Sequence, residues 1–168
     1  MAKFSKIEVL RKMGETGMVP VYYHEDLETA KQVIKACYDG GVRAFEFTNR
    51  GDFAHEVFGA LGKWADTACP ELALGAGTVI DAPTAALYLQ LGANFIKDLM
   101  APLRWSKVMV TGGVAPTRDN LEGWFKAGAY CVGMGSKLFP KDVVAAKDWQ
   151  YITDKCSECL EIIKEIRK

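Results

Sequence analysis

The sequence predicts an α/β protein of parallel strands, an incomplete TIM-type (β/α) barrel with about six of the eight strands of that fold. Helical and strand-like segments alternate along the chain, as they do in parallel α/β proteins. The stretches DGGVRAFEF, QLGANFI and KAGAYCVGM each join a helix end, a glycine and a small residue to an apolar strand. Glycines follow the late strands in TGG and GMGS, and no GxGxxG follows the first strand, which favours a barrel over a doubly wound sheet.

Hydrophobic periodicity and the glycine and proline stops place the individual elements. Apolar residues at helical spacing predict amphipathic helices, and the short apolar runs between them predict buried strands. Helices are expected at residues 3–14, 27–38, 53–68, 82–91, 120–127, near 143–146, and at 149–168. Strands are expected at residues 18–23, 42–48, 72–79, 93–96, 108–111 and 130–132.

The composition is that of an ordinary globular protein with one domain, residues 1–168. The 21 basic and 21 acidic residues cancel, so no net field attracts nucleic acid or an anionic membrane. No apolar stretch is long enough to span a bilayer, and we expect neither a signal peptide nor a membrane partner. Five cysteines favour reduced thiols and a cytoplasmic location. The pair Cys156 and Cys159 fits a helix packing face better than a metal or redox site.

One connection is too short for the predicted fold. The strands at 93–96 and 108–111 are separated by residues 97–107, and Pro102 limits any helix there to about residues 97–101. A parallel crossover needs about a dozen residues or more and usually a helix. The spacing therefore predicts that a little over one βα unit, at roughly 30 residues each, is missing. Six strands leave open edges or a cavity, unless the ends rearrange or another subunit fills the opening.

Glu46 is the first candidate for chemistry. It alternates with Ala44 and Thr48 on one face of its predicted strand. If that face lines a barrel interior, burial raises the pKa of Glu46 into the range useful for general acid/base catalysis. The alternative is a carboxylate at an exposed strand end, or one paired with Arg43 or Arg50.

Three further stretches at predicted strand ends are candidates for binding anions. The planar guanidinium of Arg50 suits a carboxylate, although a solvated surface arginine is the simpler interpretation. Gly112 and Gly113, and then Gly135 and Ser136, place small residues where backbone N–H groups can reach phosphate oxygens. The alternative for both loops is a tight turn that requires positive φ.

Lys97 directly follows the apolar run NFI. If its side chain points inward, its amine enters a partly desolvated pocket and serves as a substitute nucleophile. We expect instead a solvated lysine at the start of a short helix.

The blocks GGVRAFEFTNR, LGAGTVID, VMVTGGVAPT and CVGMGSKLFPKD resemble the 2-keto-3-deoxy-6-phosphogluconate (KDPG) aldolases, also called 4-hydroxy-2-oxoglutarate (KHG) aldolases. The resemblance implies a class I aldolase, a homotrimeric (β/α)8 barrel that forms a lysine Schiff base with pyruvate and needs no cofactor or metal. The family's fifth and sixth strands would lie between Ile96 and Lys97 and are missing. The stretch KDLMAPLRWSK resembles the helix and loop that follow the sixth strand.

The resemblance also assigns roles to individual residues. It makes Glu46 the general acid/base. It gives the Schiff-base lysine no counterpart, because that lysine belongs to a missing strand. The implied substrate contacts are Arg50 and Thr78 for the carboxylate, and Gly112, Gly113, Gly135 and Ser136 for the phosphate.

Three functions follow as hypotheses. The first is reversible cleavage of KDPG or 4-hydroxy-2-oxoglutarate to pyruvate and an aldehyde. The second is a non-catalytic subunit that binds a phosphorylated keto acid or takes part in assembly. The third is a deletion fragment without a function of its own. General acid/base catalysis contributes roughly 10²- to 10⁴-fold, less than the 10⁶-fold or more that enzymes usually supply, so Glu46 and Arg50 alone do not sustain normal aldolase turnover.

Overall fold

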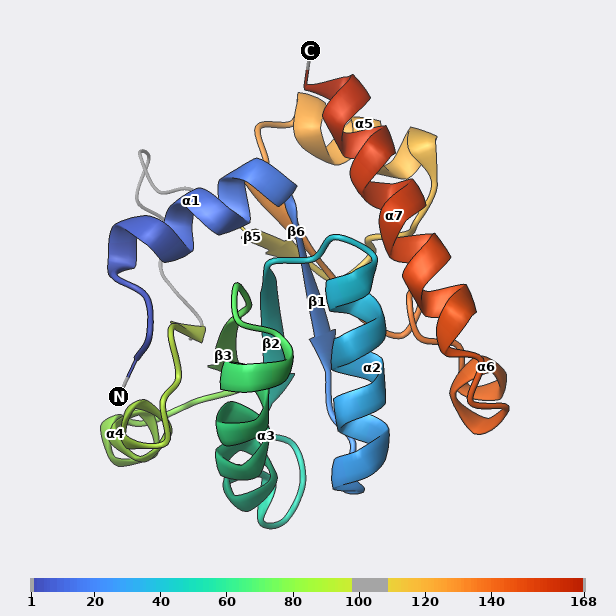
Figure 1. The fold of residues 1–168 in the computed structure, drawn as a ribbon. Helices are drawn as coiled ribbons and strands as arrows, with labels where there is room; N and C mark the ends of the chain where they lie inside the picture. The colour runs from blue at the N-terminus through green and yellow to red at the C-terminus, as the bar shows by residue number, and fades with distance from the viewer. Residues whose placement is uncertain (1, 98–108, 168) are drawn as a thin grey trace.

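The structure is a computed structural model, and it describes residues 2–97 and 109–167. In this part of the chain six strands form one curled parallel sheet, flanked by helices (Figure 1). The strands are β1 (Met18–Tyr22), β2 (Ala44–Thr48), β3 (Ala73–Gly77), β4 (Ile96–Lys97), β5 (Met109–Thr111) and β6 (Cys131–Met134). The helices are α1 (Lys6–Thr16), α2 (Leu27–Asp39), α3 (Ala54–Ala68), α4 (Ala82–Gln90), α5 (Arg118–Lys126), α6 (Lys141–Ala145) and α7 (Trp149–Ile166).

The strand order confirms the incomplete barrel. It runs β4-β3-β2-β1-β6-β5, and every pair is parallel. Strands β4 and β5 are consecutive in the sequence, yet they form the two edges of the sheet. In a closed barrel the edges would be joined, so the missing strands belong between β4 and β5. The helix expected at about residues 97–101 lies outside the described residues, apart from Lys97, which belongs to β4.

The two faces of the sheet differ in what covers them. Phe45 and Phe47 belong to the large core, together with residues of α2, α3 and α7. These helices lie on the outer side of the curled sheet (Figure 1). Ala44 and Ala73 point to the concave face and pack with Val9 of α1 in a second, smaller core. This alternation along β2 confirms the prediction that Ala44 and Glu46 share one face.

Two glycines of the sheet leave room for side chains of neighbouring segments. A Cβ atom at Gly75 of β3 would lie 2.5 Å from the ring of Phe95, so this glycine makes room for that ring on the concave face. A Cβ at Gly133 of β6 would lie 2.7 Å from the hydroxyl oxygen of Thr111 on β5. Phe95, which directly precedes β4, and Thr111 of β5 thus lie in the space that these glycines leave.

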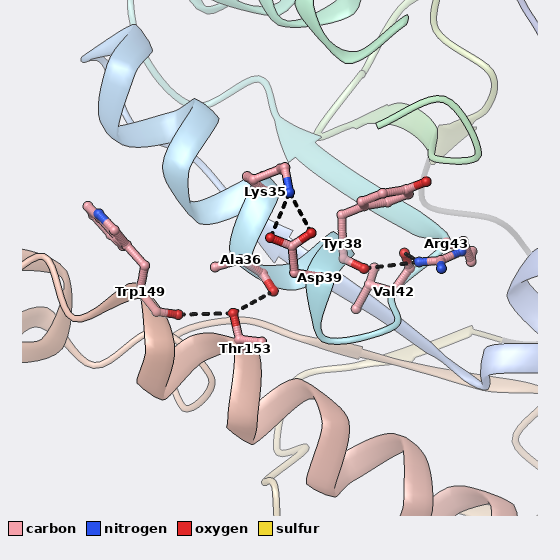
Figure 2. Close-up of polar contacts among 8 residues, drawn as sticks. All are labelled: Lys35, Ala36, Tyr38, Asp39, Val42, Arg43, Trp149 and Thr153. Carbon is pink, nitrogen blue, oxygen red and sulfur yellow. Dashed lines mark hydrogen bonds and ion pairs between the residues drawn. The ribbon is translucent and has the colours of Figure 1, made fainter. Parts of the chain in front are cut away.

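The entry into β2 is held by contacts around the end of α2, shown in Figure 2. Thr153 of α7 donates a hydrogen bond to the carbonyl oxygen of Ala36 at 3.1 Å, which ties α7 to α2. The Arg43 guanidinium donates to the carbonyl oxygen of Tyr38 at 3.0 Å (Figure 2). It also pairs with the Glu71 carboxylate at 3.3 Å. Arg43 is thus engaged outside the sheet, and the interpretation that it pairs with Glu46 is wrong.

The remaining expectations concern the C-terminal helix and the surface. Cys156 and Cys159 are buried on α7 and pack in the large core, as the helical spacing predicted. Among the described residues no group of three His, Cys, Asp or Glu side chains is placed to hold a metal ion. No helix in the described ranges is both long enough and apolar enough to cross a bilayer.

Candidate active site

Glu46 lies in β2 on the concave face, and its side chain is only 3% exposed. Space for it exists because β3 has a glycine beside it: a Cβ at Gly77 would lie 1.9 Å from Glu46 Oε1. Among the described residues, Glu46 Oε2 is a buried oxygen with no hydrogen-bond partner. The alternative of a carboxylate at an exposed strand end is therefore wrong. A buried carboxyl oxygen without a partner is costly, which makes Glu46 a candidate for function.

Lys97 reaches the same face from the edge of the sheet. It is the last residue of β4 and pairs in register with Gly77, which pairs in turn with Thr48 of β2. Its Nζ lies 3.6 Å from Glu46 Oε2, within ion-pair range but too long for a hydrogen bond. The same amine donates a hydrogen bond to Thr111 Oγ1 on β5. The side chain of Lys97 thus spans from one edge strand toward the other.

This placement corrects the expectation of a solvated lysine that starts a short helix. Parallel pairing with β3 continues through Lys97, so the residue keeps the strand conformation. Phe95, two residues earlier, already points to the concave face, and alternation puts Lys97 on that face too. The sequence contained this signal in the spacing of Phe95 and Lys97, which puts both residues on one face if the strand continues.

The surroundings of Glu46 act on its acidity in opposite directions. Burial raises the pKa of the Glu46 carboxyl, and it is the largest influence. The nearby Lys97 amine lowers the pKa, and the more distant Arg50 lowers it less, but the net pKa stays above its usual value. A carboxyl with a raised pKa keeps its proton to a higher pH than a free carboxyl and is a stronger base once it is ionised, as a general acid/base requires.

The raised pKa predicts how stability depends on pH. The folded state holds its Glu46 proton to a higher pH than the unfolded state, so the free energy of unfolding falls as pH rises through the folded-state pKa. Below the ordinary value of 4.5 the group is protonated in both states and this loss vanishes. We expect the Glu46→Gln variant to gain stability over wild type as pH rises toward neutral. Urea unfolding of both proteins across that range measures the difference, and a constant difference would contradict the prediction.

The loop after β2 is held firmly at the carboxyl end of the strand. The Asn49 N–H donates to the Gly77 carbonyl oxygen at 2.8 Å, and the hydroxyl of the buried Tyr88 donates to Asn49 Oδ1 at 2.9 Å. Burial raises the pKa of Tyr88 to about 12, so its phenol remains a proton donor. Arg50 follows directly and stays exposed, at the edge of a cavity.

That cavity, of about 670 Å³, lies at the carboxyl ends of β1, β2 and β6. Its size is typical of small-molecule sites. Four basic side chains line it, and none of its described lining residues is acidic. Its charged and polar lining residues include His24, Thr48, Arg50, Ser136, Lys141 and Lys147. The cavity is therefore suited to an anion.

Sequence reasoning found Arg50 and Ser136 but missed His24, Lys141 and Lys147. His24 follows β1, whereas Lys141 begins α6 and Lys147 follows that helix, so more than a hundred residues of chain separate His24 from the two lysines. Their one shared signal was a position beyond the carboxyl end of a predicted strand, where ligands bind in parallel α/β folds.

The other predicted anion contacts lie at the same end of the sheet but outside this cavity. Gly112 and Gly113 follow β5 with φ of 93° and 70°, the backbone that a tight turn requires. Asn120 holds this turn by donating to the carbonyl oxygen of Gly113 at 3.2 Å. Thr78 follows β3, is exposed, and has φ of 60°, which is unusual for a threonine. Gly135 precedes Ser136 at the end of β6.

The curled parallel sheet, with a buried acid near the carboxyl ends of its strands, places the chain in the (β/α)-barrel class of folds. A family model described as KDPG and KHG aldolase matches residues 9–97 of the chain. The chain belongs to this family of carbon–carbon lyases. The match ends at Lys97, where the sequence predicted that a segment is missing.

Individual relatives agree with this assignment. The chain is 37% identical to the "KHG/KDPG aldolase" of Escherichia coli K12, over 86% of this chain and 91% of the relative. It is 25% identical to the "2-dehydro-3-deoxy-phosphogluconate aldolase" of Pseudoalteromonas atlantica, over 95% and 97%. That second alignment spans 215 positions, so at least 47, the excess over 168 residues, have no counterpart here. The shortfall exceeds one βα unit of about 30 residues and agrees with the loss of two strands.

A solved structure supports the fold. The KDPG aldolase from Legionella pneumophila, captured with pyruvate as a covalent carbinolamine intermediate, superposes with a TM-score of 0.69 at 18% identity. The superposition covers 88% of this chain and 96% of that one. The six strands described here thus follow the course of a barrel that lacks part of its wall.

Proposed function

We propose that the chain catalyses reversible aldol cleavage of a 2-oxo acid, KDPG or 4-hydroxy-2-oxoglutarate, to pyruvate and an aldehyde. The observation that carries this proposal is the buried Glu46 carboxyl, whose Oε2 accepts no hydrogen bond among the described residues and forms an ion pair with the Lys97 amine at 3.6 Å. Membership of the aldolase family and the name of the Escherichia coli relative supply the reaction class. The proposal includes a homotrimer in the cytoplasm, as the resemblance of the sequence motifs implies.

Glu46 is the general acid and base in this proposal. Cleavage removes the proton of the C4 hydroxyl, the oxygen electrons form the aldehyde carbonyl, and the C3–C4 electron pair remains on C3. That carbanion then takes a proton and becomes the methyl group of pyruvate. The raised pKa of Glu46 suits it to transfer this proton in either direction.

The substrate's anionic groups are bound at the carboxyl ends of the strands. Arg50 and Thr78 bind the 2-oxo acid carboxylate, with the guanidinium supplying paired donors. The backbone N–H groups of the glycine loops and the hydroxyl of Ser136 bind the phosphate. These phosphate contacts are Gly112, Gly113, Gly135 and Ser136. The basic cavity is also lined by His24, Lys141 and Lys147, which attract a substrate with two anionic groups.

Exchange of the pyruvate methyl protons for deuterium, followed by NMR, tests the proton transfer, and a coupled assay for pyruvate release from KDPG tests cleavage. We expect measurable exchange and slower cleavage than enzymes of the family with a complete barrel achieve. The control is the Lys126→Ala variant, which removes a surface lysine paired with Glu122 and is expected to match wild type. If neither exchange nor cleavage exceeds buffer, the proposed function is wrong.

A second candidate is a non-catalytic subunit that binds a phosphorylated ligand. The observation that favours it is the cavity itself, whose lining has four basic side chains but does not include Glu46. In that case phosphorylated ligands raise the melting temperature while exchange and cleavage stay at the buffer rate. If no ligand raises the melting temperature and no turnover is detected, the third hypothesis holds, a deletion fragment without a function of its own.

A further inference from the structure

The resemblance places the family's Schiff-base lysine on one of the missing strands, yet a different amine lies beside Glu46. Lys97 Nζ lies 3.6 Å from Glu46 Oε2, an oxygen that accepts no hydrogen bond among the described residues. The amine also donates a hydrogen bond to Thr111, on the other edge strand. We propose that Lys97, at the end of β4, forms the Schiff base with the 2-oxo acid in this chain. This inference rests on the proposed function and names the amine that the reaction requires.

The geometry separates Lys97 from the other paired lysines of the described chain. The remaining lysine ion pairs join exposed or half-exposed acids on the surface, most of them along single helices. Lys97 pairs with an acid that is 3% exposed, and its own side chain is 31% exposed. The amine is therefore partly withdrawn from water while it remains reachable by a small keto acid, as a nucleophilic lysine requires.

The sheet fixes the amine in place. The register places Lys97 beside Gly77, whose lack of a side chain leaves the space that Glu46 occupies. Thr111 comes from the opposite edge strand, so its hydroxyl holds the amine toward the interior. A position set by two edge strands exists only because the strands between them are absent. This role thus belongs to the shortened sheet rather than to the complete barrel.

The covalent step balances with the groups present. The Lys97 ammonium first passes a proton to the Glu46 carboxylate of the ion pair. The resulting amine attacks C2 of the keto acid, an N–C bond forms, and the carbonyl oxygen takes a proton from the Glu46 carboxylic acid. The carbinolamine then loses water and becomes an iminium ion. Glu46, now a carboxylate, removes a C3 proton, and the C–H electrons form the enamine double bond as the iminium nitrogen is neutralised.

Reduction with sodium borohydride in the presence of pyruvate tests the inference. Hydride adds to the iminium carbon, so we expect intact mass to increase by pyruvic acid less one oxygen atom. Peptide mapping of the wild-type protein is expected to locate the adduct on Lys97. The Lys97→Met variant is expected to lose the adduct to the level seen without pyruvate, whereas Lys126→Ala retains it. Circular dichroism of each variant checks that it folds.

Measuring methyl exchange and adduct formation on the same samples distinguishes a failure of this inference from a failure of the proposed function. Methyl exchange without an adduct on Lys97, or an adduct on another lysine, overturns the inference while the lyase function stands. An adduct on Lys97 without exchange supports the inference and contradicts the lyase function. Because the adduct is mapped in the wild-type chain, the decision does not depend on how well Lys97→Met folds.

Discussion

The Glu46→Gln variant is expected to lower the rate of pyruvate methyl exchange by about 10²- to 10⁴-fold, the usual contribution of a general acid/base. Glutamine keeps the size of the side chain, so the space beside Gly77 stays filled. It cannot exchange a proton with C3 or with the carbinolamine oxygen. Deuterium incorporation measured by NMR, under saturating pyruvate, gives the ratio of the rates.

The matched control for this variant is Glu122→Gln, which removes a surface carboxylate paired with Lys126 at 2.6 Å. We expect it to exchange protons at the wild-type rate. The folded state of Glu46→Gln is checked by its unfolding curve, which should show equal or greater stability at neutral pH because a buried ionisable group has been removed. A stable Glu46→Gln protein with the full exchange rate would exclude Glu46 as the catalytic acid.

The second large effect is expected at Gly77. A Cβ atom there would lie 1.9 Å from Oε1 and 2.4 Å from Cδ of Glu46, so Gly77→Ala cannot leave this carboxyl where it is. We expect a loss of about 1–3 kcal/mol of stability from overpacking. We also expect exchange to fall by about 10²-fold, because a displacement of about 1 Å is enough for such a loss. Urea unfolding and the exchange assay measure the two effects.

Gly123 provides a matched glycine control in the interior of α5. A Cβ at this position meets no atom within 4 Å, so Gly123→Ala is expected to stabilise the protein by about 0.5–1 kcal/mol through helix propensity. Its exchange rate should equal that of wild type. If Gly77→Ala retains full exchange, the Glu46 carboxyl is not held by the geometry described here, and its proposed role fails.

Local sequence patterns predicted most of the secondary structure. The helix predicted at residues 27–38 matches α2 to within one residue. The helix predicted at residues 3–14 begins three residues later, at Lys6, because Ser5 caps α1. The alternation of Ala44 and Glu46 against Phe45 and Phe47 placed Glu46 on the correct face, because period two is a property of every strand. The absence of strands between β4 and β5 was also predictable, because a parallel crossover needs a minimum length that residues 97–107 do not reach.

The tertiary structure decided which of these residues meet. Lys97 was expected to start a short helix, because the apolar run that predicted the strand ends at Ile96. Pairing with β3 over residues 96–97 extended the strand instead and turned the lysine inward. Sequence-local propensity is weak compared with the hydrogen bonds and burial that a neighbouring strand provides. The basic cavity was missed because His24 and Lys147 come from loops that only the parallel sheet brings together.

By itself, then, the sequence determined most of the elements, the face of β2 that carries Glu46 and the place of the missing segment, since all three depend on residues near one another in the chain. The contact between Lys97 and Glu46 depends on how a sheet with two missing strands curls, and on glycines that leave room on its concave face. Distances between segments 51 residues apart are set by packing of the whole chain. Only the folded structure brings that amine to that acid.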